Sequence, residues 1–198
     1  MPEHEAIPPV VIGITGMIAS GKSYISGVFA EYGAAVQDSD KIAHEILDNE
    51  AFAQVSGLFP EAINGGKVNR KVLGELVFAD SKKLVQLEGI IHPLVRKRNL
   101  EFIKANQDKK IIILEIPLLF ESKAETYCNY TIFVNVSRET LEKRALQRPN
   151  MSKEKLEKIL ARQLSAEEKA RRADFVIDNN DGDDILLQIE AIINKVKA

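Results

Sequence analysis

A glycine, four intervening residues, and then a glycine, a lysine and a serine make up the segment from Gly16 to Ser23. This spacing is typical of a P-loop, in which successive backbone N–H groups point at phosphate oxygens and the next helix adds its positive N-terminal end. Lys22 is expected to reach the β- and γ-phosphates of a nucleotide, and Ser23 to ligate Mg²⁺. The segment therefore predicts chemistry on a nucleoside triphosphate.

Two side chains in this loop are unusual, because a phosphate loop often carries glycines where the backbone must turn freely. Met17 and Ala19 either adopt allowed torsions or weaken the site. We expect ATP to be bound by the whole stretch, which comprises Gly16, Met17, Ile18, Ala19, Ser20, Gly21, Lys22, Ser23 and Tyr24.

The elements that must position the loop flank it directly. Residues 10–15 form an apolar run rich in Val and Ile, which predicts a buried β-strand leading into Gly16. Beyond Lys22, apolar residues recur every three or four positions, which predicts a helix that ends at Gly33. Strand, loop and helix thus follow in the order that the motif requires.

Two carboxylates follow the next predicted strand, residues 34–37: Asp38 and Asp40. In open α/β sheets, ligands bind outside the carboxyl ends of the strands. A kinase of small hydroxyl compounds needs a carboxylate that accepts or orients the hydroxyl proton, and often a second one near Mg²⁺. The alternative is that one of them only caps a helix starting near Lys41.

Arginines and asparagines in the C-terminal third are further candidates. Arg144 and Arg148 lie on a predicted helix that Pro149 stops, ahead of a basic helical stretch. We expect this stretch to close as a lid that brings cations to the γ-phosphate, although a charged run is more commonly a solvated face. Asn179 and Asn180 follow the last predicted strand and either contact a nucleotide base or turn the chain.

Another buried strand is predicted at residues 111–116, which are apolar except for Glu115. That glutamate stands where the water-activating carboxylate of an ATPase motor is found, but we favour a core-edge residue paired to a basic side chain. Residues 41–106 read as mostly helical, far longer than a simple crossover requires. His92 precedes Pro93 there and is either a packed residue or a substrate contact.

Composition excludes several classes of protein. The 198 residues carry a formal net charge of -2, which gives no global electrostatic case for nucleic acid or a membrane surface. Cys128 is the single cysteine, so no internal disulfide forms, and a reducing compartment is favoured. No apolar run approaches the length of a membrane helix, and the N-terminal residues do not resemble a signal peptide. We expect a cytoplasmic protein.

Taken in order, the motifs resemble those of the dephospho-coenzyme A kinase family from about Val11 to Val196. The resemblance rests on IGITG with SGKS, DSD at residues 38–40, HP at 92–93, IPLLFE at 116–121, KR and QR ending at Arg144 and Arg148, Gln163, and ADFVIDNNDG at 173–182. It implies an α/β fold, a P-loop NTPase with a three-layer parallel sheet, helices on both faces, a helical substrate-binding insertion and a lid. It also implies transfer of phosphate from ATP, with Mg²⁺, to the ribose 3′-hydroxyl of dephospho-CoA.

The resemblance also suggests roles for individual residues. Asp40 resembles the general base, and Asp38 is placed near the substrate or a water of the metal. Lys22, Arg144 and Arg148 are expected to stabilise the transferred group. The adenine pocket would include Asn179 and Asn180, and the substrate contacts would comprise Asp38, Asp40, His92, Pro117 and Leu118.

The expected organisation is a loose leader at residues 1–9 and one kinase domain at residues 10–198. Its parts are a core at 10–40, 108–148 and 173–198, a CoA-binding insertion at 41–107 and a lid at 149–172. Dephospho-CoA is the expected partner, with no nucleic acid, membrane or obligate protein partner.

Four other readings compete with this one. The nearest is another small P-loop kinase, acting on a nucleoside monophosphate or a sugar-like alcohol. A GTPase switch, an ATP-driven motor and a P-loop protein without catalytic activity are the others. The GTPase reading is disfavoured because the γ-phosphate-sensing and guanine-binding motifs of that class do not appear in the sequence.

Overall fold

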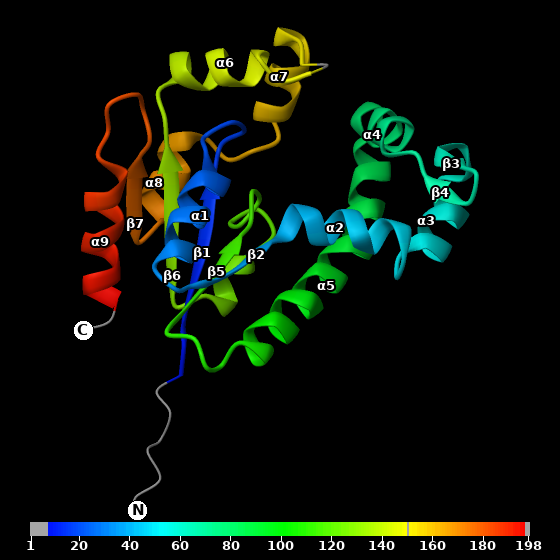
Figure 1. The fold of residues 1–198 in the computed structure, drawn as a ribbon. Coiled ribbons are helices and arrows are strands. Elements are labelled where there is room, and N and C mark those ends of the chain that lie inside the picture. The colour runs from blue at the N-terminus through cyan, green and yellow to red at the C-terminus, as the bar shows by residue number, and fades with distance from the viewer. Residues whose placement is uncertain (1–7, 150, 197–198) are drawn as a thin grey trace, which may run out of the picture. The chain divides into compact units, whose positions relative to one another are not determined.

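The computed structural model describes residues 8–149 and 151–196 (Figure 1). Most of the expected leader, residues 1–7, lies outside the described residues, as does residue 150 of the expected lid. The chain divides into two compact units. We call the described residues up to 38 and from 103 onward the sheet unit, and residues 39–102 the insert unit.

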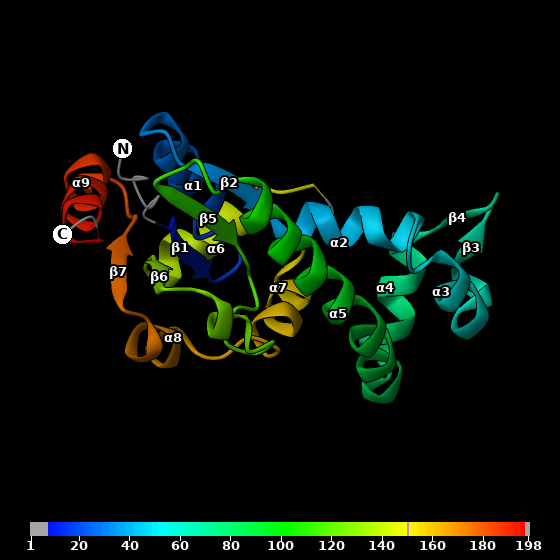
Figure 2. The ribbon, with the colours of Figure 1, turned by 90° about the horizontal axis from the view of Figure 1, so that it is seen from below.

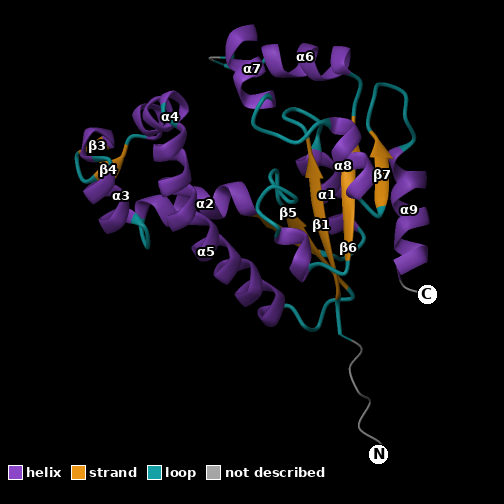
Figure 3. Cartoon of the chain, turned by 180° about the vertical axis from the view of Figure 1, so that it is seen from behind, coloured by secondary structure: helices purple, strands orange, loops and turns teal. Residues whose placement is uncertain are grey.

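The sheet unit contains a five-stranded parallel sheet in the order β2-β5-β1-β6-β7. Its strands are β1 (Val10–Gly16), β2 (Ala35–Asp38), β5 (Ile111–Glu115), β6 (Tyr130–Asn135) and β7 (Phe175–Asp178). The central strand is β1, which pairs with β5 on one side and β6 on the other, as Figure 3 shows. The phosphate loop therefore leaves the middle of the sheet at the carboxyl ends of its strands, where ligands bind in such folds.

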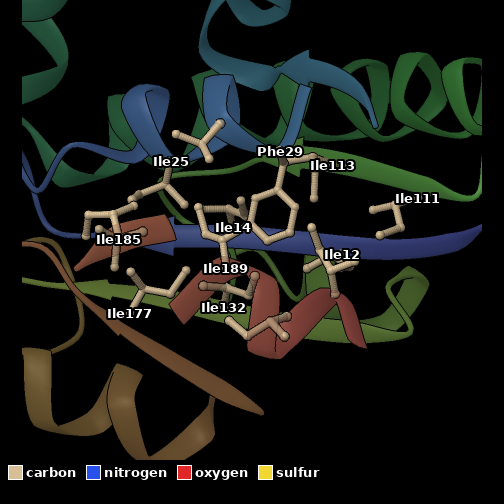
Figure 4. Packing of buried hydrophobic residues seen from close by; sticks show 14 of the residues in the cluster. Ile12, Ile14, Ile25, Phe29, Ile111, Ile113, Ile132, Ile177, Ile185 and Ile189 are labelled. Carbon is tan, nitrogen blue, oxygen red and sulfur yellow. The ribbon is translucent and has the colours of Figure 1, made fainter. Parts of the chain in front are cut away.

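Helices cover both faces of this sheet. They are α1 (Lys22–Glu31), α8 (Ala166–Arg172) and α9 (Ile185–Val196). Helices α6 (Arg138–Leu146) and α7 (Lys153–Leu160) lie beyond the carboxyl ends of the strands (Figure 1), and a 3₁₀ turn spans Ala124–Tyr127. Branched side chains from β1, β5 and β6 pack against α1 and α9 on one face, with Ile14, Phe29 and Ile189 fully buried (Figure 4). The opposite face is lined by Phe133 of β6, and α8 lies on that side (Figure 2).

The insert unit has its own core. Its elements are α2 (Ser39–Asp48), α3 (Phe52–Leu58), a 3₁₀ turn (Pro60–Ala62), β3 (Ile63–Asn64), β4 (Lys67–Val68), α4 (Arg70–Ala79) and most of α5 (Ser81–Ala105). Gly65 and Gly66, both with positive φ, turn the chain between β3 and β4. Apolar side chains from every helix of the unit pack together around Phe59, which is 1% exposed.

The α/β class and the order of elements predicted from the sequence are confirmed, and several boundaries differ. The helix expected to carry Arg148 ends at Leu146, because the residue before a proline disfavours helical torsions. The strand at 111 ends at Glu115, one residue early. Pro93 lies inside α5. Among the described residues, none of the helices is both long and apolar enough to cross a membrane.

Candidate active site

The phosphate loop depends on glycine at its end. Gly21 precedes α1 with φ at 90°, a region that favours glycine. A Cβ added there would lie 2.2 Å from Nδ2 of Asn179. The position therefore requires glycine both for its torsion and for space.

The two unusual side chains of the loop are buried. Met17 and Ala19 are 8% and 7% exposed and belong to an apolar cluster with Phe133 and Leu141. Ala19 adopts φ of 60°, which for a residue other than glycine costs about 1–2 kcal/mol. The loop thus accommodates both side chains, and the burial of the methyl group opposes the strain at Ala19.

Lys22 is the first residue of α1, and its side chain folds back over the loop. Its Nζ donates to the carbonyl oxygens of Gly16 and Met17, each at 3.2 Å. The ammonium group is therefore held at the mouth of the loop by backbone acceptors.

Ser23 faces the end of the neighbouring strand. Its hydroxyl donates to Oε1 of Glu115 at 2.9 Å, and Glu115 is 6% exposed. Burial raises the pKa of the Glu115 carboxyl, and the hydrogen bond from Ser23 opposes that shift. The charge of Asp38, which lies opposite Glu115 in the β2–β5 register, raises the pKa further, whereas the charge of Lys22 lowers it. The sequence did not indicate that Ser23 is the partner of Glu115.

This donor set fits Mg²⁺. A hydroxyl from Ser23 and carboxylates from Glu115 and Asp38 meet at one edge of the sheet, and oxygen ligands are those that Mg²⁺ prefers. Within the described ranges, no group of three or more His, Cys, Asp or Glu residues is placed to hold a metal on its own. A Mg²⁺ ion would therefore be shared between these oxygens and the phosphates of a nucleotide.

A chain of hydrogen bonds joins α6 to the phosphate loop. Arg144 donates from Nη1 to the carbonyl oxygen of Asn179 at 2.9 Å and from Nη2 to Oδ1 of Asp181 at 3.2 Å. The Asn179 side chain in turn donates from Nδ2 to the carbonyl oxygen of Ser20 at 2.8 Å. This arrangement links the guanidinium group to the loop through a single residue.

The neighbouring asparagine has a different task. Oδ1 of Asn180 accepts from the backbone N–H of Ser137, the N-cap of α6, at 2.8 Å. Both side-chain amides of the Asn179–Asn180 pair therefore bind backbone groups of other segments of the chain. Arg148 lies beyond the end of α6 and is exposed, as is Tyr24 on α1.

Three residues near the loop were not foreseen in these roles. Oε1 of Gln163 accepts from the backbone N–H of Ile18 within the phosphate loop at 3.2 Å. Lys169 on α8 has a fully buried side chain and pairs with Glu121 at 3.0 Å. Lys169 lies in a highly charged segment that reads as a solvated helix, so the sequence carried no signal for its burial.

The remaining predicted residues occupy both units. Pro117 and Leu118 follow β5 in the sheet unit, where both are half-buried. Asp40 lies in the first turn of α2 in the insert unit and is exposed, as is His92 on α5. Ser39 at the start of α2 is buried and bonded to Asn99 of α5, which anchors the first turn of α2.

Comparison with known proteins decides the family. A family model described as dephospho-CoA kinase matches residues 10–184 of the chain. The chain belongs to the dephospho-CoA kinase family. A protein of Rhizobium meliloti named dephospho-CoA kinase is 38% identical over 192 residues, which cover 96% of this chain and 99% of the relative.

Solved structures agree with the dephospho-CoA kinase assignment. A crystal structure from Thermus thermophilus matches with a TM-score of 0.86 at 34% identity, covering 96% of this chain and 99% of that one. The dephospho-CoA kinase of Campylobacter jejuni matches with a TM-score of 0.69 at 32% identity, covering 94% and 96% of the two chains. The resemblance inferred from the motifs is confirmed, and the chain is a kinase with a P-loop fold.

Proposed function

We propose that this protein transfers the γ-phosphoryl group of ATP to the ribose 3′-hydroxyl of dephospho-CoA, which yields coenzyme A and ADP. The observation that carries the proposal is the family match over residues 10–184, which includes the phosphate loop and the strand ends around it. The fold supplies a loop suited to a triphosphate, with Lys22 and Ser23 at its end.

We assign proton acceptance to Asp40. The 3′-hydroxyl would give its proton to this carboxylate as its oxygen forms a bond to the γ-phosphorus, while the bond between that phosphorus and the bridging oxygen of ADP breaks. ADP leaves with the electron pair of the broken bond. The exposed position of Asp40, two residues beyond the end of β2, supports this assignment.

Other residues bind and orient the nucleotide in this proposal. Lys22 would exchange its two backbone acceptors for β- and γ-phosphate oxygens. Arg144 and Arg148, which precede the lid at residues 149–172, would engage phosphates. Ser23 would hold Mg²⁺ directly, and Asp38 through water. When bound, the ion would act as a Lewis acid that stabilises the negative charge on the phosphate oxygens.

The substrate contacts remain proposals of the same kind. Asp38, His92, Pro117 and Leu118 would contact dephospho-CoA, and residues 41–107 would form its binding part. Asn179 and Asn180 would border the adenine, through groups that their present hydrogen bonds leave available. We further propose that the enzyme works in the cytoplasm, consistent with its single cysteine.

An ADP-release assay across dephospho-CoA, AMP, CMP and shikimate tests the substrate. Turnover is expected with dephospho-CoA, and turnover only with a nucleoside monophosphate would replace this proposal with that of a different P-loop kinase.

Asp40→Asn tests the general base. The substitution is expected to lower kcat by about 10² to 10⁴, because a positioned base contributes that much, and to change the Kd for dephospho-CoA far less. Steady-state kinetics with a binding measurement by calorimetry separates the two effects. An unchanged kcat would remove Asp40 from the mechanism.

A further inference from the structure

Lys169 is the most deeply buried charged residue among those described, with a side chain that is 0% exposed. Lysine is almost never fully buried unless it is paired. Its Nζ lies 3.0 Å from Oε1 of Glu121 and donates to the carbonyl oxygen of Pro117 at 2.9 Å. It also lies 3.5 Å from Oγ1 of Thr15. We call Thr15, Pro117, Glu121 and Lys169 the Lys169 cluster.

The cluster reaches the phosphate loop through Thr15. This threonine directly precedes Gly16, where the loop begins, and is itself fully buried. Its hydroxyl donates to the carbonyl oxygen of Pro117 at 2.9 Å, so the threonine and the lysine share one acceptor. The end of β1 and the chain after β5 are thereby held together by a cation and a hydroxyl.

The same cluster holds the segment that leads into α8. Oε1 of Glu121 accepts from the backbone N–H of Leu164 at 2.8 Å. The adjacent Gln163 accepts from the N–H of Ile18 in the phosphate loop at 3.2 Å. The segment before α8 is thus fastened at two successive residues, one to Glu121 and one to the loop itself.

The ammonium group is needed to keep this arrangement. Burial lowers the pKa of Lys169, and the hydrogen bond and charge of Glu121 oppose that shift only in part. Oε2 of Glu121 is buried, and no donor from the described part of the chain reaches it. Loss of the lysine alone would therefore leave a buried carboxylate without compensation, which is strongly destabilising in proteins.

We propose that Lys169 is a positioning residue for nucleotide binding. It acts on the phosphate loop through Thr15, Pro117 and Glu121, without touching the nucleotide. Its ammonium sets the end of β1 against the Pro117 segment, and through Glu121 it keeps Gln163 on the loop. The inference concerns the ATP site and rests on the proposed function only in taking ATP as the nucleotide.

Two variants separate positioning from stability. Lys169→Met with Glu121→Gln removes both buried charges together, and Gln retains an acceptor for Leu164. Thr15→Val keeps the shape of the threonine and removes its hydroxyl, while Thr15→Ser is the matched control that keeps the hydroxyl. Lys109→Met, which removes an exposed lysine in the loop before β5, controls for the loss of a positive charge.

The readouts are Tm and the Kd for Mg·ATP by calorimetry, which requires no acceptor substrate. In Thr15→Val and the double variant we expect a Kd raised about tenfold or more with Tm within a few degrees of wild type. Thr15→Ser and Lys109→Met are expected to bind as wild type does. A faster exchange of the Ile18 amide hydrogen is expected in both weakened variants.

If the double variant folds and binds Mg·ATP with the wild-type Kd, the proposal is overturned, and the Lys169–Glu121 ion pair has a purely structural role. If the double variant does not fold, wild-type binding by Thr15→Val has the same meaning. Wild-type protein that binds Mg·ATP but does not phosphorylate dephospho-CoA would refute the proposed function and leave this inference standing.

Discussion

At the scale of single residues, the phosphate loop and the helix that follows it depend on hydrogen bonds to residues of other strands and loops. Asn179 is 7% exposed and supports the loop by donating to the carbonyl oxygen of Ser20. Glu115 accepts from Ser23 while burial raises the pKa of its carboxyl. These two hydrogen bonds hold the phosphate loop and the start of α1 in place. Substitutions of Asn179 and Glu115 test them.

Asn179→Asp is nearly isosteric and replaces the donor at Ser20 with an acceptor. We expect the Kd for Mg·ATP to rise about tenfold or more, because an unsatisfied buried polar group costs about 1–3 kcal/mol. Calorimetry measures the change. Asn129→Asp is the matched control, since the Oδ1 that accepts from Val11 at the other end of β1 is retained. Equal binding by the two variants would contradict the supporting role of Asn179.

Glu115→Gln tests the sign of a pKa shift. Because the folded protein holds the Glu115 proton more tightly than the unfolded chain does, this carboxyl lowers stability as the pH rises from about 4.5 through its raised pKa. The glutamine variant is therefore expected to match wild type in acid and to become the more stable of the two toward neutral pH. Thermal melts from pH 4 to 8 measure this difference. A Glu115→Gln variant that lost stability at neutral pH would show that the buried carboxylate is compensated by other groups.

Glu142→Gln should behave in the opposite way. The hydrogen bond from Arg138 lowers the pKa of Glu142, so this group stabilises the fold above its unfolded pKa and that contribution is lost in acid.

At the scale of elements, the junction between β1 and α1 leaves no room for a side chain at Gly21. Gly21→Ala is expected to abolish measurable binding of Mg·ATP, because its Cβ would meet Nδ2 of Asn179 at 2.2 Å and its φ is 90°. Gly27→Ala lies within α1 with no heavy atom near the added methyl group, and should stabilise the protein by about 0.4–1 kcal/mol. Nucleotide titration measures the loss of binding in Gly21→Ala, and thermal melts measure the gain of stability in Gly27→Ala. Normal binding by Gly21→Ala would mean that the loop can re-form around a side chain.

At the scale of the whole molecule, two separate cores predict two regions of stability. Phe59→Ala should destabilise the insert unit by about 3–5 kcal/mol and accelerate hydrogen exchange in α2 to α4, while β1, β5 and β6 keep their protection. Phe29→Ala should do the reverse, since Phe29 is buried in the core of the sheet unit. Loss of protection in both units from either substitution would show that they unfold as one.

The sequence by itself determined the parts of this protein that depend on local pattern. The run of Val and Ile before Gly16 predicted a strand, because a strand buried on both faces is apolar throughout. The glycine, lysine and serine that follow predicted the phosphate loop, since backbone torsion and phosphate contact demand those residue types. The motifs spread from Val11 to Val196 were specific enough, taken together, to indicate the family.

Only the tertiary structure decided which residues support that loop from a distance. These residues are far away in the sequence from the segment that they hold: 145 residues separate Ile18 from Gln163, 154 separate Thr15 from Lys169, and 159 separate Ser20 from Asn179. Local periodicity carries no information about such pairs, because it reports the face of an element and not the partner that covers it. A lysine in a charged helix is expected to face solvent, and only the fold shows that Lys169 is buried against Glu121.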